Sequence, residues 1–260
     1  MLADVQKQKP LVDLEINEVG ISDLKMPCKF KSKKTVVNTV GNFSFSTALD
    51  KDLRGTHMSR LVEILHKYLK TPIGRAELIE LSLEAKNKLG SGCSIFKVEF
   101  DYFKLKTAPV SRLKNYLHYR CGVNIYSNCE TIMILNVEIP ISSLCPCSKE
   151  ISEGGAHNQR GVVKIRADIS DLPDVWLDEL ISLGEKSSSC DLYSLLKRED
   201  EKFVTEKAYN NPKFVEDLVR DVANKLNGLG VKNYIISCKN YESIHSHNAY
   251  ATIKKGILCI

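Results

Sequence analysis

The pattern of apolar and polar residues divides the first half of the chain into strands that flank two helices. Alternating or β-branched runs predict strands at residues 95–105 and 116–125, and one strand or a hairpin at residues 35–49. Between these patterns, apolar residues recur at helical spacing over 58–69 and 78–89. Thr56 is the predicted N-cap of the first helix, and Gly90 is the predicted stop of the second.

The second half repeats this order of strands, helices and strands. Its strand patterns cover 131–141, 161–169, 234–238 and 249–258, and its helical patterns cover 177–183, 192–196 and 212–226. Asn211 is the predicted N-cap of the last helix, because Pro212 suits the first helical position. The recurrence predicts two modules of one kind, divided near Ser127, although the halves share no clear residue-level repeat.

These patterns give three predicted parts. Residues 1–33 carry prolines at positions 10 and 27 and little periodicity, which predicts an N-terminal arm or an edge strand. Residues 34–127 form the first predicted module, and residues 128–260 form the second.

Composition is that of an ordinary soluble globular protein, with 43% hydrophobic and 27% charged residues. No run approaches the roughly 18 apolar residues of a membrane span, and the stretch from Leu2 to Lys7 lacks the apolar core of a signal peptide. We therefore expect a cytoplasmic protein with no membrane partner.

The net charge of +5 is dispersed along the 260 residues. A nucleic-acid-binding protein usually has a basic stripe or a recognisable motif, and neither is present, so we expect no nucleic-acid partner. A mild positive excess suits an anionic small substrate such as a nucleotide.

Cysteine and histidine supply the first candidate chemistry. In the reducing cytosol the nine cysteines are expected to be thiols, and four of them are predicted to be small buried residues: Cys93, Cys121, Cys129 and Cys238. Cys145 and Cys147 have polar, loop-like neighbours, and His157 follows Cys145 by twelve residues. A loop that folds back would let a thiolate and this imidazole share one divalent metal.

Other candidate residues are less specific on their own. His245 and His247 are two apart, so in an extended chain they project to one face and could bracket one ligand. An exposed loop or a hydrogen-bonded pair is the alternative. For Glu201 and Glu216, the alternative to a functional role is an ordinary solvated carboxylate on a helix. A structural zinc site is a further alternative for the Cys145 segment, although such sites normally have four ligands.

Taken together, the segments resemble the type IB GTP cyclohydrolases over nearly the whole chain. The resemblance is carried by Gly55-Thr56-His57-Met58-Ser59-Arg60, Leu144-Cys145-Pro146-Cys147-Ser148-Lys149-Glu150-Ile151-Ser152, Gly155-Ala156-His157-Asn158-Gln159-Arg160, Tyr193-Ser194-Leu195-Leu196-Lys197-Arg198 and Glu242-Ser243-Ile244-His245-Ser246-His247-Asn248-Ala249-Tyr250.

The resemblance implies an α+β tunnelling fold, in which two tandem ββααββ modules with antiparallel sheets assemble into an oligomeric β-barrel. It implies a homo-oligomer, expected to be a tetramer, with active sites at module and subunit interfaces. It also implies hydrolysis of GTP to formate and 7,8-dihydroneopterin triphosphate, the first step towards folate and related pterins.

Carried onto matching positions, the resemblance implies a divalent metal, zinc, manganese or ferrous iron, held by Cys145, His157 and Glu201. Glu216 matches the family carboxylate that binds N1 and the exocyclic amine of guanine. Glu242, His245 and His247 match the positions of the acid-base residues of the family. For the triphosphate, the cationic side chains Arg160, Lys149 and Arg60 are the candidates, because guanidinium and ammonium groups suit phosphate oxygens.

Three other functions stay open at this point. A close variant would form a cyclic phosphate product. A nitrile reductase of the same fold would use Cys145 as a nucleophile and NADPH as hydride donor, but no segment resembles a nicotinamide-binding motif. A non-enzymatic, zinc-stabilised binding module would unfold when its metal is removed.

Overall fold

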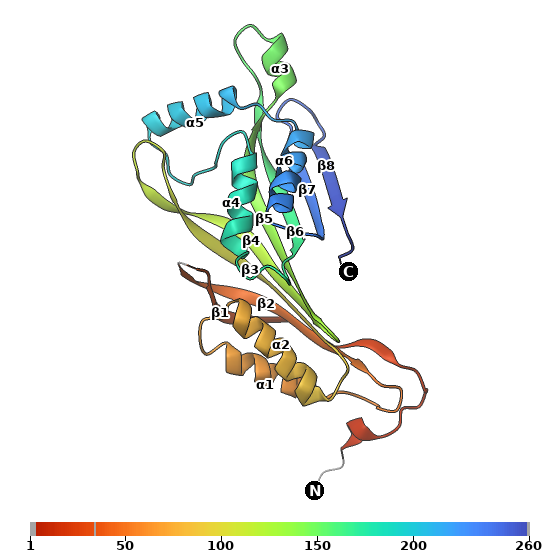
Figure 1. The fold of residues 1–260 in the computed structure, drawn as a ribbon. Helices are drawn as coiled ribbons and strands as arrows, with labels where there is room; N and C mark the ends of the chain where they lie inside the picture. Colours follow the sequence, from red (N-terminus) through yellow and green to blue (C-terminus); the bar gives the residue numbers. More distant parts are fainter. Residues whose placement is uncertain (1–3, 34, 259–260) are drawn as a thin grey trace. The chain divides into compact units, whose positions relative to one another are not determined.

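The computed structural model describes residues 4–33 and 35–258, which form an α+β fold with eight strands and six α-helices (Figure 1). The strands form one sheet in which each strand neighbours the next in sequence, from β1 to β8. The predicted α+β class is therefore confirmed. Lys34, the predicted first residue of the first module, and Leu2 and Ala3 lie outside the described residues.

The strands are β1 (Ile16–Lys31), β2 (Val36–Leu49), β3 (Ser94–Thr107), β4 (Lys114–Ser127), β5 (Thr131–Leu144), β6 (Asn158–Asp168), β7 (Tyr234–Asn240) and β8 (Ala249–Lys255). The helices are α1 (Met58–Tyr68), α2 (Arg75–Leu89), α3 (Pro146–Ile151), α4 (Leu177–Ser187), α5 (Arg198–Asn210) and α6 (Val215–Gly228). None of these described helices is long and apolar enough to cross a membrane.

The chain forms two compact units. The first holds the described residues up to Asp101 together with Gly122–Ile134, and the second holds Tyr102–Cys121 together with the described residues from Leu135 onward. Strands β3, β4 and β5 each contribute residues to both units. The predicted sequence division at residue 127 coincides with the end of β4 and stays a prediction.

The first unit is built on the antiparallel pairing of β1, β2 and β3. β1 is an edge strand, one of the two alternatives predicted for this region, and an edge tolerates Pro27, which has no N–H to donate. The region predicted as one strand or a hairpin forms a single strand, β2. Aromatic side chains pack between the strands, with the rings of Phe30 and Phe100 stacked at 3.6 Å.

Helices α1 and α2 lie side by side in this unit (Figure 1). Leu61, Ile64 and Leu65 form the buried stripe of α1, as helical spacing predicts. The predicted stop of α2 is confirmed, because Gly90 takes the left-handed conformation (φ 65°) that favours glycine.

The predicted cap of α1 is wrong. His57 occupies the N-cap position and makes no side-chain capping bond. Thr56 instead lies one residue before the cap, where its carbonyl oxygen accepts a 3.0 Å hydrogen bond from the Gln6 side chain. Thr56 is therefore engaged with a residue fifty positions away rather than with the first turn of the helix.

The second unit places α4 and α6 side by side, with α6 packed against β7 and β8 (Figure 1). α6 buries the apolar residues Leu218, Val222 and Leu226 at helical spacing. It begins at Val215 rather than at Pro212, and Phe214, not Asn211, is its N-cap. Asn211 is used elsewhere, because its amide donates to the carbonyls of Ser188 and Ser189.

The helix predicted at residues 192–196 is also wrong, since this segment has no helical structure and α5 follows it instead. Five residues are too few to nucleate a helix without support from packing. Here the Ser194 hydroxyl donates a 2.6 Å hydrogen bond to the carbonyl of Tyr116, and this bond holds the non-helical segment against β4.

The described cysteines are all free thiols. Two of the four predicted to be buried, Cys121 and Cys238, are buried, and burial raises the pKa of the Cys238 thiol to about 12. Cys93 is only half-buried. Cys129 is exposed, contrary to prediction, because it lies in the tight turn between β4 and β5 rather than in a strand.

Candidate active site

The loop between β5 and β6 brings Cys145 and His157 together. The backbone N–H of Cys145 donates to the carbonyl of His157 at 3.0 Å, so the residues after β5 and before β6 face each other. Ser148 bridges them, because its hydroxyl oxygen accepts the His157 N–H at 3.1 Å and its hydroxyl donates to the Cys145 carbonyl at 3.2 Å. The predicted fold-back of this loop is therefore present.

The two thiols of the loop have different surroundings. Cys145 is half-buried at the N-cap of α3, where its sulfur accepts the N–H of Ser148 at 3.5 Å. Pro146 occupies the first turn of α3, and its fixed φ suits this position. Cys147 is exposed within the helix. Only Cys145 faces inward with His157.

The ring of His157 has one hydrogen-bond acceptor and one carboxylate nearby. Its Nδ1 lies 2.8 Å from the Gln159 side-chain oxygen, and a carboxylate oxygen of Glu242 is 3.8 Å away, beyond hydrogen-bond distance. Donation to Gln159 requires the proton on Nδ1, and in the neutral ring that tautomer leaves the Nε2 lone pair free to bind a metal.

The loop after β7 supplies Glu242 and two further imidazoles. It is anchored where the Tyr241 N–H donates to the Arg160 carbonyl at 2.9 Å. The rings of His245 and His247 are stacked with centroids 5.0 Å apart, and His245 lies 6.4 Å from the His157 ring. Both rings are exposed, so this group is open to solvent and to a ligand.

Glu201 and Glu216 lie in the first turns of α5 and α6. Both are exposed, and neither side chain makes a hydrogen bond or ion pair with another described residue. Across residues 4–33 and 35–258, no three His, Cys, Asp or Glu side chains lie close enough to hold a metal ion. The structure thus brings Cys145, His157 and Glu242 together but does not bring Glu201 to them.

The candidate phosphate-binding side chains have unlike surroundings. The Lys149 ammonium donates a 2.6 Å hydrogen bond to the backbone carbonyl of Tyr209. It also lies 4.3 Å from the centre of the Tyr209 ring, so this contact joins α3 to α5. Arg160 is exposed on β6, close to the anchor of the Glu242 loop. Arg60 belongs to the first unit.

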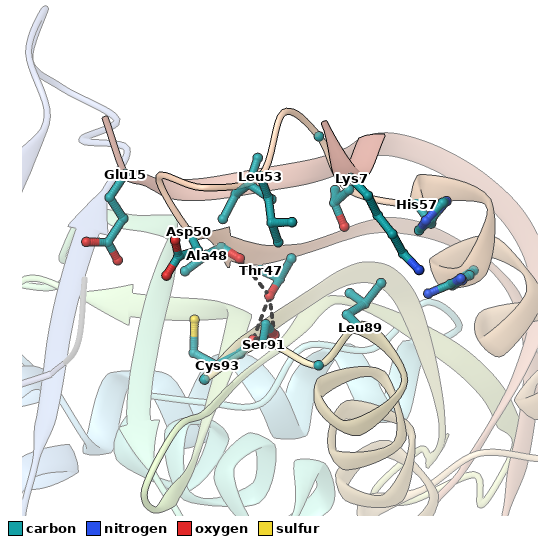
Figure 2. A pocket seen from close by; sticks show the side chains of 16 residues that line it. Lys7, Glu15, Thr47, Ala48, Asp50, Leu53, His57, Leu89, Ser91 and Cys93 are labelled. Carbon is teal, nitrogen blue, oxygen red and sulfur yellow. Dashed lines mark hydrogen bonds between the residues drawn. The ribbon is translucent and has the colours of Figure 1, made fainter. Parts of the chain in front are cut away.

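Arg60 lines a pocket of about 330 Å³ in that unit, close to the usual lower bound for ligand pockets (Figure 2). Figure 2 shows Lys7 and His57 at one end of the pocket and Glu15 and Asp50 at the other. Lys7 and His57 also lie within 3.8 Å and 3.5 Å of one carboxylate oxygen of Asp4. Lys7 and His57 therefore lie together at one end of the pocket, beside the Asp4 carboxylate.

Three neighbours of the candidate residues were not predicted from sequence: Ser148, Gln159 and Asp200. Ser148 and Gln159 lie within the segments that carry the family resemblance, which is the only sequence signal they give. Asp200 accepts the N–H of the N-cap residue Lys197 three positions earlier, but lysine is not among the usual N-cap residues, so no sequence pattern marked this start of a helix.

The sequence profile of one family, described as Type I GTP cyclohydrolase folE2, matches residues 2–251. The chain belongs to this family. Similar proteins named GTP cyclohydrolase FolE2 include one from Desulfosudis oleivorans, 44% identical over 259 residues with 98% of each chain covered. Another, from Thermosipho melanesiensis, is 42% identical over 262 residues with 99% of each chain covered.

Solved structures with a similar fold include uricase from Arthrobacter globiformis, with a TM-score of 0.54 and 10% identity over 94% of this chain and 95% of that chain. A hyper-thermostable AgUricase mutant has a TM-score of 0.56 at 10% identity, with 94% of each chain covered. At this identity the likeness concerns the fold alone, and the predicted tunnelling fold fits it.

Proposed function

We propose that this protein is a metal-dependent GTP cyclohydrolase, which converts GTP to formate and 7,8-dihydroneopterin triphosphate in the first step of folate and pterin synthesis. Membership of the family supports the activity. The observation that carries the site is the approach of two segments to His157: Cys145 is bonded to it through the backbone, and a carboxylate oxygen of Glu242 lies 3.8 Å from its Nδ1.

Cys145, His157 and Glu201 would hold one divalent metal, either zinc, manganese or ferrous iron. The donor set fits, because a thiolate, an imidazole with a free Nε2 and a carboxylate are ligands of catalytic divalent metals and leave a place for water. The free carboxylate of Glu201 supports its part in this set. When bound, the metal activates water for attack on guanine C8.

Glu242, His245 and His247 would move the protons. Opening the imidazole ring, releasing formate and closing the pterin ring each need proton transfers, for which imidazoles are apt at neutral pH. A carboxylate oxygen of Glu242 lies 3.8 Å from Nδ1 of His157, so this acid-base group is close to the proposed ligand. The exposed rings of His245 and His247 are stacked, and the His245 ring lies 6.4 Å from the His157 ring.

Glu216 would recognise guanine, because a carboxylate accepts two parallel N–H bonds, from N1 and from the exocyclic amine. Its exposed position at the start of α6 leaves it free to do so. Arg160, Lys149 and Arg60 would bind the triphosphate. For Arg60, the company of Lys7 and His57 in one pocket supports this role.

The assembly we propose is a homotetramer whose sheets join into a β-barrel, with active sites at the interfaces. The two edges of the sheet support it, since β1 and β8 each have one strand neighbour and expose backbone groups to pairing with another chain.

Turnover of GTP by the metal-loaded protein tests the proposal. Formate release and pterin fluorescence should both appear, and Cys145→Ala should abolish both together with stoichiometric metal. Cys147→Ala is the matched control, because this exposed thiol lies two residues away and should be dispensable. No turnover with zinc, manganese or ferrous iron would refute the proposal, and product mass distinguishes the linear triphosphate from a cyclic phosphate.

A further inference from the structure

Asp200, the residue before Glu201, is fully buried, and its carboxylate accepts four hydrogen bonds. Oδ1 accepts the backbone N–H groups of Val110 at 2.8 Å and Ser111 at 2.9 Å. Oδ2 accepts the Ser111 hydroxyl at 2.5 Å and the Lys197 N–H at 2.9 Å. Both oxygens are therefore fully engaged.

Three of these four bonds come from a part of the chain about ninety residues away. Val110 and Ser111 lie in the turn between β3 and β4, which is closed by a 2.8 Å bond from the Ala108 N–H to the Leu113 carbonyl. A helix cap requires only the bond from Lys197. Asp200 thus does more than cap α5, because it fastens the first turn of the helix to the β3–β4 turn.

Little else holds that end of α5. Asp200 and Ala208 are the only buried residues of the helix. The other contacts lie further along the helix: Val204 packs against the cluster of Leu144, Cys190 and Ala208, Lys207 is 3.5 Å from Asp191, and the Tyr209 carbonyl accepts from Lys149. The position of the first turn, and with it the Glu201 backbone, therefore depends mainly on Asp200.

We propose that Asp200 is a positioning residue for the metal site: by joining the first turn of α5 to the β3–β4 turn, it fixes where the neighbouring Glu201 carboxylate can reach. This inference rests on the proposed function, in which Glu201 is a metal ligand. It adds Asp200 and Ser111 to the residues on which metal affinity depends, although neither would touch the metal.

Metal affinity, measured by competition with a chelator and by calorimetry, tests the proposal. Ser111→Ala removes one bond to Asp200 from outside the helix and keeps both backbone bonds, so the variant should fold. Its metal affinity should fall by about 10–100-fold, the usual effect of removing a group that orients a ligand. Ser111→Thr keeps the hydroxyl and should restore affinity, and Glu199→Gln, an exposed neighbour, should have no effect.

A second measurement separates positioning from general destabilisation. If Ser111 and Asp200 act through Glu201, Ser111→Ala and Asp200→Asn should weaken metal binding in the native background and add nothing in a Glu201→Ala background. Equal losses in both backgrounds, or unchanged affinity in Ser111→Ala, would overturn the positioning role. Unchanged affinity in Glu201→Ala alone would refute the ligand assignment itself, which is a distinguishable failure.

Discussion

The buried hydroxyl of Tyr119 donates a 2.5 Å hydrogen bond to Oε1 of Glu185, and the Lys106 ammonium donates to the same oxygen at 2.6 Å. Tyr119 is fully buried, and the Glu185 side chain is only 7% exposed. A second lysine, Lys104, lies 3.5 Å from the other carboxylate oxygen. This group joins β3 and β4 to α4 inside the second unit, where a carboxylate needs such partners.

Tyr119→Phe should lower the free energy of unfolding at neutral pH by about 1.5–3 kcal/mol, the usual range for a hydrogen bond to a charged group. Glu185 keeps its lysine partners in the variant, so the fold should survive. Tyr116→Phe is the control, because Tyr116 is 60% exposed. Urea unfolding of the three proteins measures the difference, and equal losses in both variants would contradict the role of this bond.

The same bond predicts a dependence on alkaline pH. Burial and the nearby Glu185 carboxylate raise the pKa of Tyr119 well above its ordinary value of about 10. A group whose pKa is raised on folding contributes stability that is complete below the unfolded pKa and is lost as pH rises towards the folded one. Stability should therefore fall above about pH 10, and Tyr119→Phe should reduce the fall seen in urea melts.

Glu242→Gln should lower kcat for GTP by about 10²–10⁴-fold, because it removes an acid-base group while keeping the shape of the side chain. Metal content should stay stoichiometric, since Glu242 is not among the proposed ligands. Steady-state kinetics and metal analysis give the two values. Glu153→Gln, in the exposed loop after α3, is the matched control and should behave as the unaltered protein.

Gly161→Ala should destabilise the protein by about 1–3 kcal/mol and weaken turnover. A Cβ at this position would lie 2.6 Å from the Asn240 side-chain oxygen and 2.7 Å from the Lys239 carbonyl, so β6 and β7 would have to move apart. The Glu242 loop follows β7 directly and would move with it. Gly154→Ala meets no atom within 4 Å and should change neither unfolding nor activity.

Gly90→Ala should cost about 1 kcal/mol of stability through the backbone alone. Gly90 has a left-handed φ of 65°, and a Cβ there would meet no atom within 4 Å, so no packing effect competes. Gly92 is equally open but lacks the left-handed φ, and Gly92→Ala should be neutral or slightly stabilising. Thermal melts of the pair isolate the cost of the left-handed conformation.

Sequence predicted those elements whose signal is local. The strands alternate or carry β-branched runs, and α1 and α6 bury apolar residues at helical spacing, so each pattern can be read without its neighbours. α5 gave no such signal, because only Asp200 and Ala208 are buried and its larger apolar residues, Phe203, Val204 and Tyr209, are exposed or half-buried. Its position depends on a turn about ninety residues earlier, which no local pattern contains.

The candidate site, too, could be predicted from sequence only where its residues lie close together in the chain. The neighbourhood of Cys145 and His157 could be predicted, since twelve residues form a short loop between two strands. The contact of Glu242 with His157 joins segments far apart in sequence, and only the resemblance suggested it. The roles of Gln159 and Ser148 depend on which way a side chain turns within an already identified segment, and residue type alone does not fix that.

The closed loop between Cys145 and His157 makes this region suitable for engineering. Its ends are tied by a backbone bond and by Ser148, while Gly154 and Gly155 lie in open space. Because the free energy of closing a loop grows only slowly with its length, a peptide inserted between the two glycines would leave both ends in place. A fluorescent or affinity tag at this point would report on the site without entering it.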